Sequence, residues 1–339
     1  MKLAYVWNKA GKKIVNIKDI SLGYMRIKEK DRTSDYLLIP VWDFYGSETT
    51  NKDGQAIVET RLLIYYYGSK ILDILRSDIK RALTSWGFFA GIIGMILIIL
   101  IGASVVILPV IQQGAGEGLA AGFHARTLLT ALSSDVMLLC APILCALPYT
   151  AAFVDDYKSG YLKEYLPRSG KERYIKAKVA ATALSGGLCL FIGIIAAYIL
   201  FALVFMPMEL APQIQTAAIL EKMDRAVDIA QPSLFAVILG RACIFFLFGS
   251  LWSLVGALLS SVTMSKYMAY ASPFIIYYVL VILCERYIKS LYVINPQQWL
   301  TVPEAWPGGG WGVALFLVEL IAILSIGFAL SVSGRLSDA

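Results

Sequence analysis

The feature that most constrains this sequence is a series of long apolar segments separated by short polar stretches. A membrane-spanning helix needs roughly 20 mainly apolar residues, because the hydrocarbon core is about 30 Å thick. Six segments meet this requirement, at about 86–110, 131–154, 179–205, 235–261, 268–284 and 312–333. The sequence therefore predicts an all-α, multi-pass membrane protein with six transmembrane helices.

The composition agrees with a membrane protein. Hydrophobic residues make up 58% of the 339 residues and charged residues 16%, whereas soluble domains usually have about 45–50% apolar and about 25% charged residues. This argues against a soluble globular enzyme and against a disordered chain. The net charge of +6 is too modest to indicate nucleic acid as a partner.

The distribution of Lys and Arg between the spans predicts the orientation, because inner loops of membrane proteins are enriched in them. If the N-terminus is cytoplasmic, the inner segments carry 13 Lys and Arg and the outer segments carry 5. Seven of the 13 lie in the single segment 155–178. Six spans also place both termini on one side. We therefore expect both the N-terminus and the C-terminus in the cytoplasm.

The first 66 residues differ from the rest of the chain, since 19 of them are charged. Alternating runs such as KKIVNI and YLLIPVWDFYG, with an NKDG turn at 51–54, are typical of β-strands. The run YLLIPVWDFYG also resembles part of a domain in some Gram-positive surface lipoproteins. The chain thus divides into a small β-rich N-terminal extension (1–66) and a six-span membrane domain (67–339). The extension is either a fused piece or a small cytoplasmic appendage.

Four polar segments accompany the spans. Residues 69–85 have apolar residues at helical spacing and predict an amphipathic helix in the inner interface before the first span. Residues 155–178 form a highly charged inner loop, and 206–234 predict a short amphipathic outer helix. Residues 285–311 mix aromatics, prolines and glycines, which fits an interfacial or partly re-entrant outer segment.

Recognisable catalytic and metal-binding patterns are missing from the sequence. The cysteines are Cys140, Cys145, Cys189, Cys243 and Cys284, each in an apolar run without a CxxC pair, and the single histidine is His124. A zinc site needs about four clustered ligands, so we expect no metal site. The SGK at 169–171 lacks the upstream glycine of a phosphate loop. We therefore expect no catalytic residues and no cofactor in this chain.

A few residues within the spans are candidates for a substrate path or for helix contacts. Glu319 lies near the middle of the sixth span, where an ionisable group costs roughly 2.5–3.5 kcal/mol on insertion scales. It lines a path or a subunit contact, or it is a buried carboxyl bonded to a neighbouring helix. Asp135 lies nearer the outer end of the second span, and Arg241 lies a turn or two into the fourth. Gly87 and Gly91 form a GxxxG pair suited to close helix packing.

The loop after the second span has a pattern that resembles a known family. Its sequence FVDDYKSGYLKEYLPRSGKERYIKAK is similar to the signature of ABC-2 type transporter permeases, with Asp156 where the family favours Glu. The matching residues are Asp156, Gly160, Leu162, Leu166, Pro167, Arg168, Ser169, Tyr174 and Lys178. The NPQQWL at 295–300 also resembles the family's segment between the last two spans. The resemblance covers about 69–335.

The resemblance implies a function. The chain would be the membrane-spanning permease subunit of an ABC exporter in the bacterial plasma membrane, paired with a second permease subunit. Separate ATPase subunits would bind ATP and Mg²⁺ and would contact the 155–178 loop as the coupling segment. Two alternatives remain, a secondary transporter or channel that uses Glu319, and a polytopic membrane enzyme. The transported substrate is not readable from the sequence.

Overall fold

A computed structural model describes most of the chain as strands, helices and the turns between them. The described residues are 2–8, 11–28, 36–52, 55–65, 71–113, 119, 122–162, 166, 170–205, 207, 234–287, 292–301 and 308–337. Contacts between Cα atoms divide the chain into two compact units. The first comprises residues 1–74 and 160–174, and the second comprises 75–159 and 175–339.

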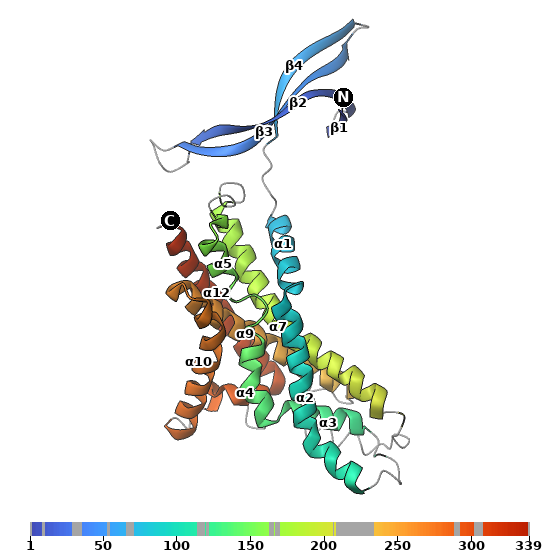
Figure 1. Cartoon of the computed structure of the whole chain (residues 1–339), viewed down its shortest axis with the longest axis vertical. Coiled ribbons are helices and arrows are strands. Elements are labelled where there is room, and N and C mark those ends of the chain that lie inside the picture. Colours follow the sequence, from blue (N-terminus) through green and yellow to red (C-terminus); the bar gives the residue numbers. More distant parts are fainter. Residues whose placement is uncertain are drawn as a thin grey trace. The chain divides into compact units, whose positions relative to one another are not determined.

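The N-terminal segment contains an antiparallel sheet of four strands. They are β1 (Lys2–Asn8), β2 (Gly11–Lys28), β3 (Tyr36–Lys52) and β4 (Gln55–Tyr65). The strands lie in sequence order, β1-β2-β3-β4, so each pairs with its neighbour along the chain as a hairpin (Figure 1). The register between β2 and β3 shifts between Ile17 and Asp19.

From residue 71 onward the described chain is mainly helical. The helices are α1 (Ile71–Leu83), α2 (Trp86–Gln113), α3 (Phe123–Leu132), α4 (Asp135–Leu144), α5 (Ala152–Lys158), α7 (Lys171–Phe205), α9 (Leu234–Thr263), α10 (Lys266–Arg286), the 3₁₀ helix η2 (Tyr292–Ile294), α11 (Pro296–Thr301) and α12 (Gly309–Ser337).

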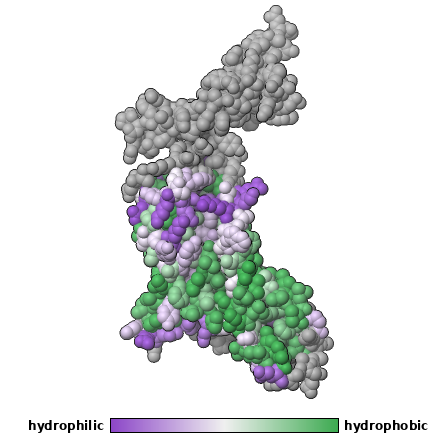
Figure 2. All heavy atoms as spheres, viewed as in Figure 1, coloured by the Kyte–Doolittle hydropathy of each residue, from purple (hydrophilic) through white to green (hydrophobic). Residues whose placement is uncertain are grey.

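Several of these helices are suited to a bilayer. By length and composition, α2, α7, α9, α10 and α12 could each cross a membrane, and there are six spans if α3 and α4 together make one. On the face in Figure 2, hydrophobic residues cover much of the lower part of the helical unit, with hydrophilic residues above them and at the lower edge. The prediction of a helical, multi-pass membrane protein is confirmed at this level.

The second predicted span, 131–154, is wrong as one continuous helix. Helices α3 and α4 are bent by 69° relative to each other. The side chain of Ser134 caps the new helix by accepting a hydrogen bond from the backbone N–H of Met137 at 3.4 Å, and such a cap favours a helix start. After Leu144 the chain turns through a stretch containing Pro148 before α5 begins. Proline cannot donate the backbone hydrogen bond that would continue the helix.

The other helical predictions differ mainly at their ends. The amphipathic helix expected at 69–85 is present as α1. The third span begins earlier than expected, at Lys171, because α7 continues through the charged residues before the apolar run. Within 285–311 the structure has the short helices η2 and α11. The helix expected at 206–234 lies outside the described residues, apart from Pro207 and from Leu234, the first residue of α9.

Helix α9 lies at the centre of the core of the helical unit. It is the most buried of the five long helices, whereas α12 is the least buried. Trp252 of α9 is fully buried and its ring lies 5.5 Å from that of Tyr277 of α10, edge to face. Such aromatic pairs add to the free energy of apolar burial. The core therefore forms around α9, and α12 covers only part of it.

Small residues allow the closest helix contacts. A Cβ placed on Gly249 of α9 would lie 2.7 Å from the carbonyl oxygen of Gly186 of α7, so the two backbones touch. Ser253 of α9 donates a hydrogen bond to the carbonyl oxygen of Thr182 at 3.1 Å beside this contact. In α2, Gly87 packs against the carbonyl group of Leu147, and Gly91 packs against Cys189 Sγ.

Candidate functional site

The two ends of the charged loop meet in a buried ion pair. Lys178 Nζ of α7 lies 2.7 Å from Asp156 Oδ2 of α5. Their side chains are only 1% and 2% exposed. A charge removed from water is costly unless it is paired and hydrogen-bonded. The pair therefore joins the end of α5 to α7 at the base of the loop.

Helix α1 adds one charge of each sign to this pair. Arg81 Nη1 lies 2.6 Å from Asp156 Oδ1, and Asp78 Oδ1 lies 3.3 Å from Lys178 Nζ. Asp78 and Arg81 are three residues apart in α1, so they lie on one face of the helix. The four side chains contain two carboxylates and two cations, and their formal charges cancel.

Tyr149 completes the group from the turn between α4 and α5. Its hydroxyl donates to Asp78 Oδ1 at 2.7 Å and accepts from Lys178 Nζ at 2.9 Å. Lys178 thus donates to Asp156, Asp78 and Tyr149, which matches the three N–H donors of an ammonium group. We call these five residues, Asp78, Arg81, Tyr149, Asp156 and Lys178, the ionic cluster.

The cluster changes the protonation behaviour of its members. Burial acts to raise the pKa of Asp156, but the nearby charges and hydrogen bonds of Lys178 and Arg81 outweigh burial and hold that pKa below its ordinary value. Burial, together with the negative charge of Asp78, raises the pKa of Tyr149. At neutral pH the carboxyl of Asp156 is therefore ionised and the phenol of Tyr149 is protonated.

Two glycines of the loop have backbone conformations that other residues rarely adopt. Gly160 follows α5 with φ of 76°, and Gly170 precedes α7 with φ of 79°. A glycine in the left-handed region just after a helix is a common helix ending. A Cβ on either glycine would meet nothing within 4 Å. The need for glycine here therefore comes from the backbone conformation alone.

The remaining loop residues named from the sequence have different environments. Leu162 and Tyr174 are buried, and Leu166 is half-buried. Pro167, Arg168 and Ser169 (167–169) lie outside the described residues. Of the nine residues in the pattern, the structure thus brings Asp156 and Lys178 into direct contact.

Sequence reasoning missed three members of the cluster. Asp78 and Arg81 lie within the predicted amphipathic helix at 69–85, and Tyr149 lies within the predicted second span at 131–154. The available signal was the pair of opposite charges three residues apart in α1. No pattern in the sequence indicated which distant residues this pair would meet.

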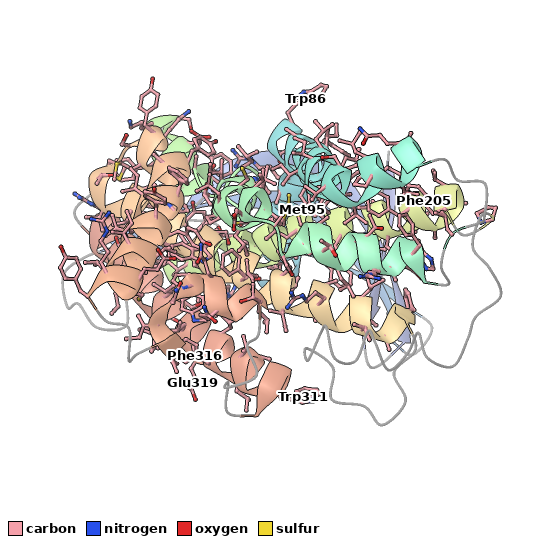
Figure 3. The ribbon with its side chains drawn as sticks, turned by 90° about the horizontal axis from the view of Figure 1, so that it is seen from below. Trp86, Met95, Phe205, Trp311, Phe316 and Glu319 are labelled. Carbon is pink, nitrogen blue, oxygen red and sulfur yellow. The ribbon has the colours of Figure 1, made fainter. Side chains whose placement is uncertain are left out.

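The charged residues proposed for the spans separate into two places. Asp135 and Arg241 line one cavity at the bend between α3 and α4, where Arg241 Nη2 donates to Ser133 Oγ at 3.1 Å. Glu319 is exposed and projects from the surface-exposed face of α12 (Figure 3). The three residues therefore do not line one common path through the described part of the chain.

No protein-family model matches the sequence, and no curated protein matches it. The functional argument therefore rests on the residues of the loop and on the geometry of the ionic cluster.

Proposed function

We propose that this chain is the membrane-spanning permease subunit of an ABC exporter. The observation that carries the proposal is the buried contact between Asp156 and Lys178, the first and last residues of the loop pattern. A loop that passes movement from an ATPase to membrane helices must be firmly attached to those helices. The ion pair and its neighbours in α1 supply such an attachment for α5 and α7.

In this proposal the 155–178 loop contacts a separate ATPase subunit on the cytoplasmic side. The ATPase binds ATP and Mg²⁺, and its movement on binding and hydrolysis is passed through the loop to α5, α7 and α1. Two permease subunits form the translocation path in the bacterial plasma membrane, with both termini in the cytoplasm. The Lys and Arg bias of the sequence supports this orientation.

A photo-crosslinking amino acid at Leu166 tests the proposal in the host membrane. We expect a crosslink to a protein that carries a phosphate-loop motif, and we expect inverted vesicles to need ATP for transport. The matched control places the same crosslinker at Trp311, which is exposed at the start of α12. The proposal would be contradicted if an ion gradient drove transport and if position 166 formed no crosslink to an ATPase.

The geometry gives less support to a secondary transporter that uses Glu319. Such a mechanism needs the carboxylate inside a path that opens to each side in turn. Glu319 projects from the surface-exposed face of α12, which is the least buried of the long helices (Figure 3).

A further inference from the structure

A cavity of about 750 Å³ opens at the bend between α3 and α4. Its walls come from α2, α3, α4 and α9. This volume lies within the roughly 300–1,000 Å³ that ligand pockets usually have. Non-helical backbone at membrane depth is tolerated where it lines a water-filled cavity. The break at Ser133 and Ser134 lies in the wall of this cavity, so the cavity can hold polar groups.

Two opposite charges line the cavity. Arg241 is 3% exposed, and its guanidinium is held by the hydrogen bond to Ser133. Asp135, in the first turn of α4, is exposed and lines the same cavity. A guanidinium matches the geometry of phosphate oxygens, and a carboxylate attracts an ammonium group. A cavity with one charge of each sign is therefore complementary to a zwitterion.

Exposed apolar side chains also line the cavity. Ile101 and Val105 of α2 are 56% and 73% exposed and belong to the lining, as does Val136 of α4. Large apolar side chains on the surface of a long apolar helix face lipid once the helix is in a bilayer. The lining of the cavity thus combines charged groups with apolar side chains suited to hydrocarbon, and such a combination fits an amphiphile better than a small soluble ion.

We propose that this cavity binds a zwitterionic phospholipid with an amine headgroup. The lipid phosphate lies at Arg241, its ammonium group lies at Asp135, and its acyl chains run along Ile101 and Val105. The proposal does not depend on an ATPase partner, and binding is measured without nucleotide. Its failure would therefore leave the proposed transport function untouched.

Native mass spectrometry of the full chain in detergent provides the test, with phosphatidylethanolamine and phosphatidylglycerol of identical acyl chains as probes. We expect the natural chain to retain phosphatidylethanolamine in preference to phosphatidylglycerol. Asp135→Asn should reverse the preference, since it removes the site for the ammonium group. Arg241→Gln should weaken binding of both lipids by roughly tenfold or more, and Arg241→Lys should keep part of it.

Two controls keep the test decisive. Arg126→Gln alters an exposed arginine of α3 that does not line the cavity, and it should leave the preference unchanged. Because Asp135 is exposed, Asp135→Asn should fold normally even if Arg241→Gln does not. An unchanged lipid preference in Asp135→Asn would overturn the proposal. Equal competition by glycerophosphoethanolamine, which lacks acyl chains, would overturn the assignment of an amphiphile.

Discussion

Charged side chains have opposite environments in the ionic cluster and on the exposed face of α12. In the cluster, Asp156 and Lys178 are buried, and each contacts a group of opposite charge. On α12, Glu319 is exposed among exposed apolar side chains and forms no ion pair with any residue that the structure describes. The first arrangement holds helices of one chain together. The second leaves a carboxylate whose cost in lipid, roughly 2.5–3.5 kcal/mol, must be relieved by something outside the described contacts.

The largest effect is expected from breaking the cluster. Lys178→Met leaves Asp156 buried with one of its two cations, and loss of one partner from a buried ion pair usually costs about 3–5 kcal/mol. Thermal unfolding of the purified protein in detergent measures this loss. Lys266→Ala is the matched control, because Lys266 forms an exposed ion pair with Asp155, the neighbour of Asp156. Equal shifts in the two variants would contradict the difference between the buried and the exposed pair.

The tight contact between α7 and α9 should respond more strongly to an added methyl group than an exposed position on α12 does. Gly249→Ala introduces a methyl group 2.7 Å from the carbonyl oxygen of Gly186, and overpacking of this kind costs about 1–3 kcal/mol. Gly334→Ala in α12 meets nothing within 4 Å and should be neutral or stabilising by about 0.5–1 kcal/mol, since alanine favours helix. Denaturant unfolding of both variants checks the difference. A cost at position 334 that matched the cost at 249 would refute it.

Acid should weaken the ionic cluster by protonating Asp156. The pKa of Asp156 is lower in the folded chain than in the unfolded chain. Its stabilising contribution is therefore fully present above the unfolded pKa and is lost as the pH falls through the folded pKa, in the range below about pH 4. Melting temperatures measured across this range should show the loss. Asp156→Asn should be less stable at neutral pH and should lack this part of the acid dependence.

The smallest effect is expected at Glu319. Glu319→Gln removes a charge that no described contact uses, so the free energy of unfolding in detergent should change by less than about 0.5 kcal/mol. Denaturant unfolding is again the measurement. A loss above 1 kcal/mol would mean that Glu319 belongs to a polar network of the chain, and the contrast with the cluster would then fail.

The local sequence predicts the long helices well, because the length of an apolar run is enough to indicate each of them. The runs around Gly91 and Trp252 are long enough to span a bilayer, and the structure has long helices there. The bend after Leu132 is harder to predict. The serines at 133 and 134 do not break a helix by themselves. Helix α4 starts there with Ser134 as its N-cap, whose hydroxyl accepts a hydrogen bond from the backbone N–H of Met137. Helix ends such as Lys171 also depend on packing beyond the apolar run.

The cluster could be predicted only in part. Asp156 and Lys178 were named because they belong to a recognisable loop pattern, but the pattern does not show that they touch. Tyr149 and Asp78 are 71 residues apart, and Asp78 and Lys178 are 100 apart. Contacts at such separations arise from how the helices pack, and a single sequence carries no local signal for them.

The meeting of three chain segments at Lys178 Nζ also limits how the protein can move. Lys178 Nζ donates hydrogen bonds to Asp78 of α1, to Asp156 of α5 and to Tyr149 of the turn before α5. Lys178 itself belongs to α7. None of these segments can slide past another without breaking several charged contacts at once. We therefore expect α1, α5 and the start of α7 to move together when the protein changes conformation.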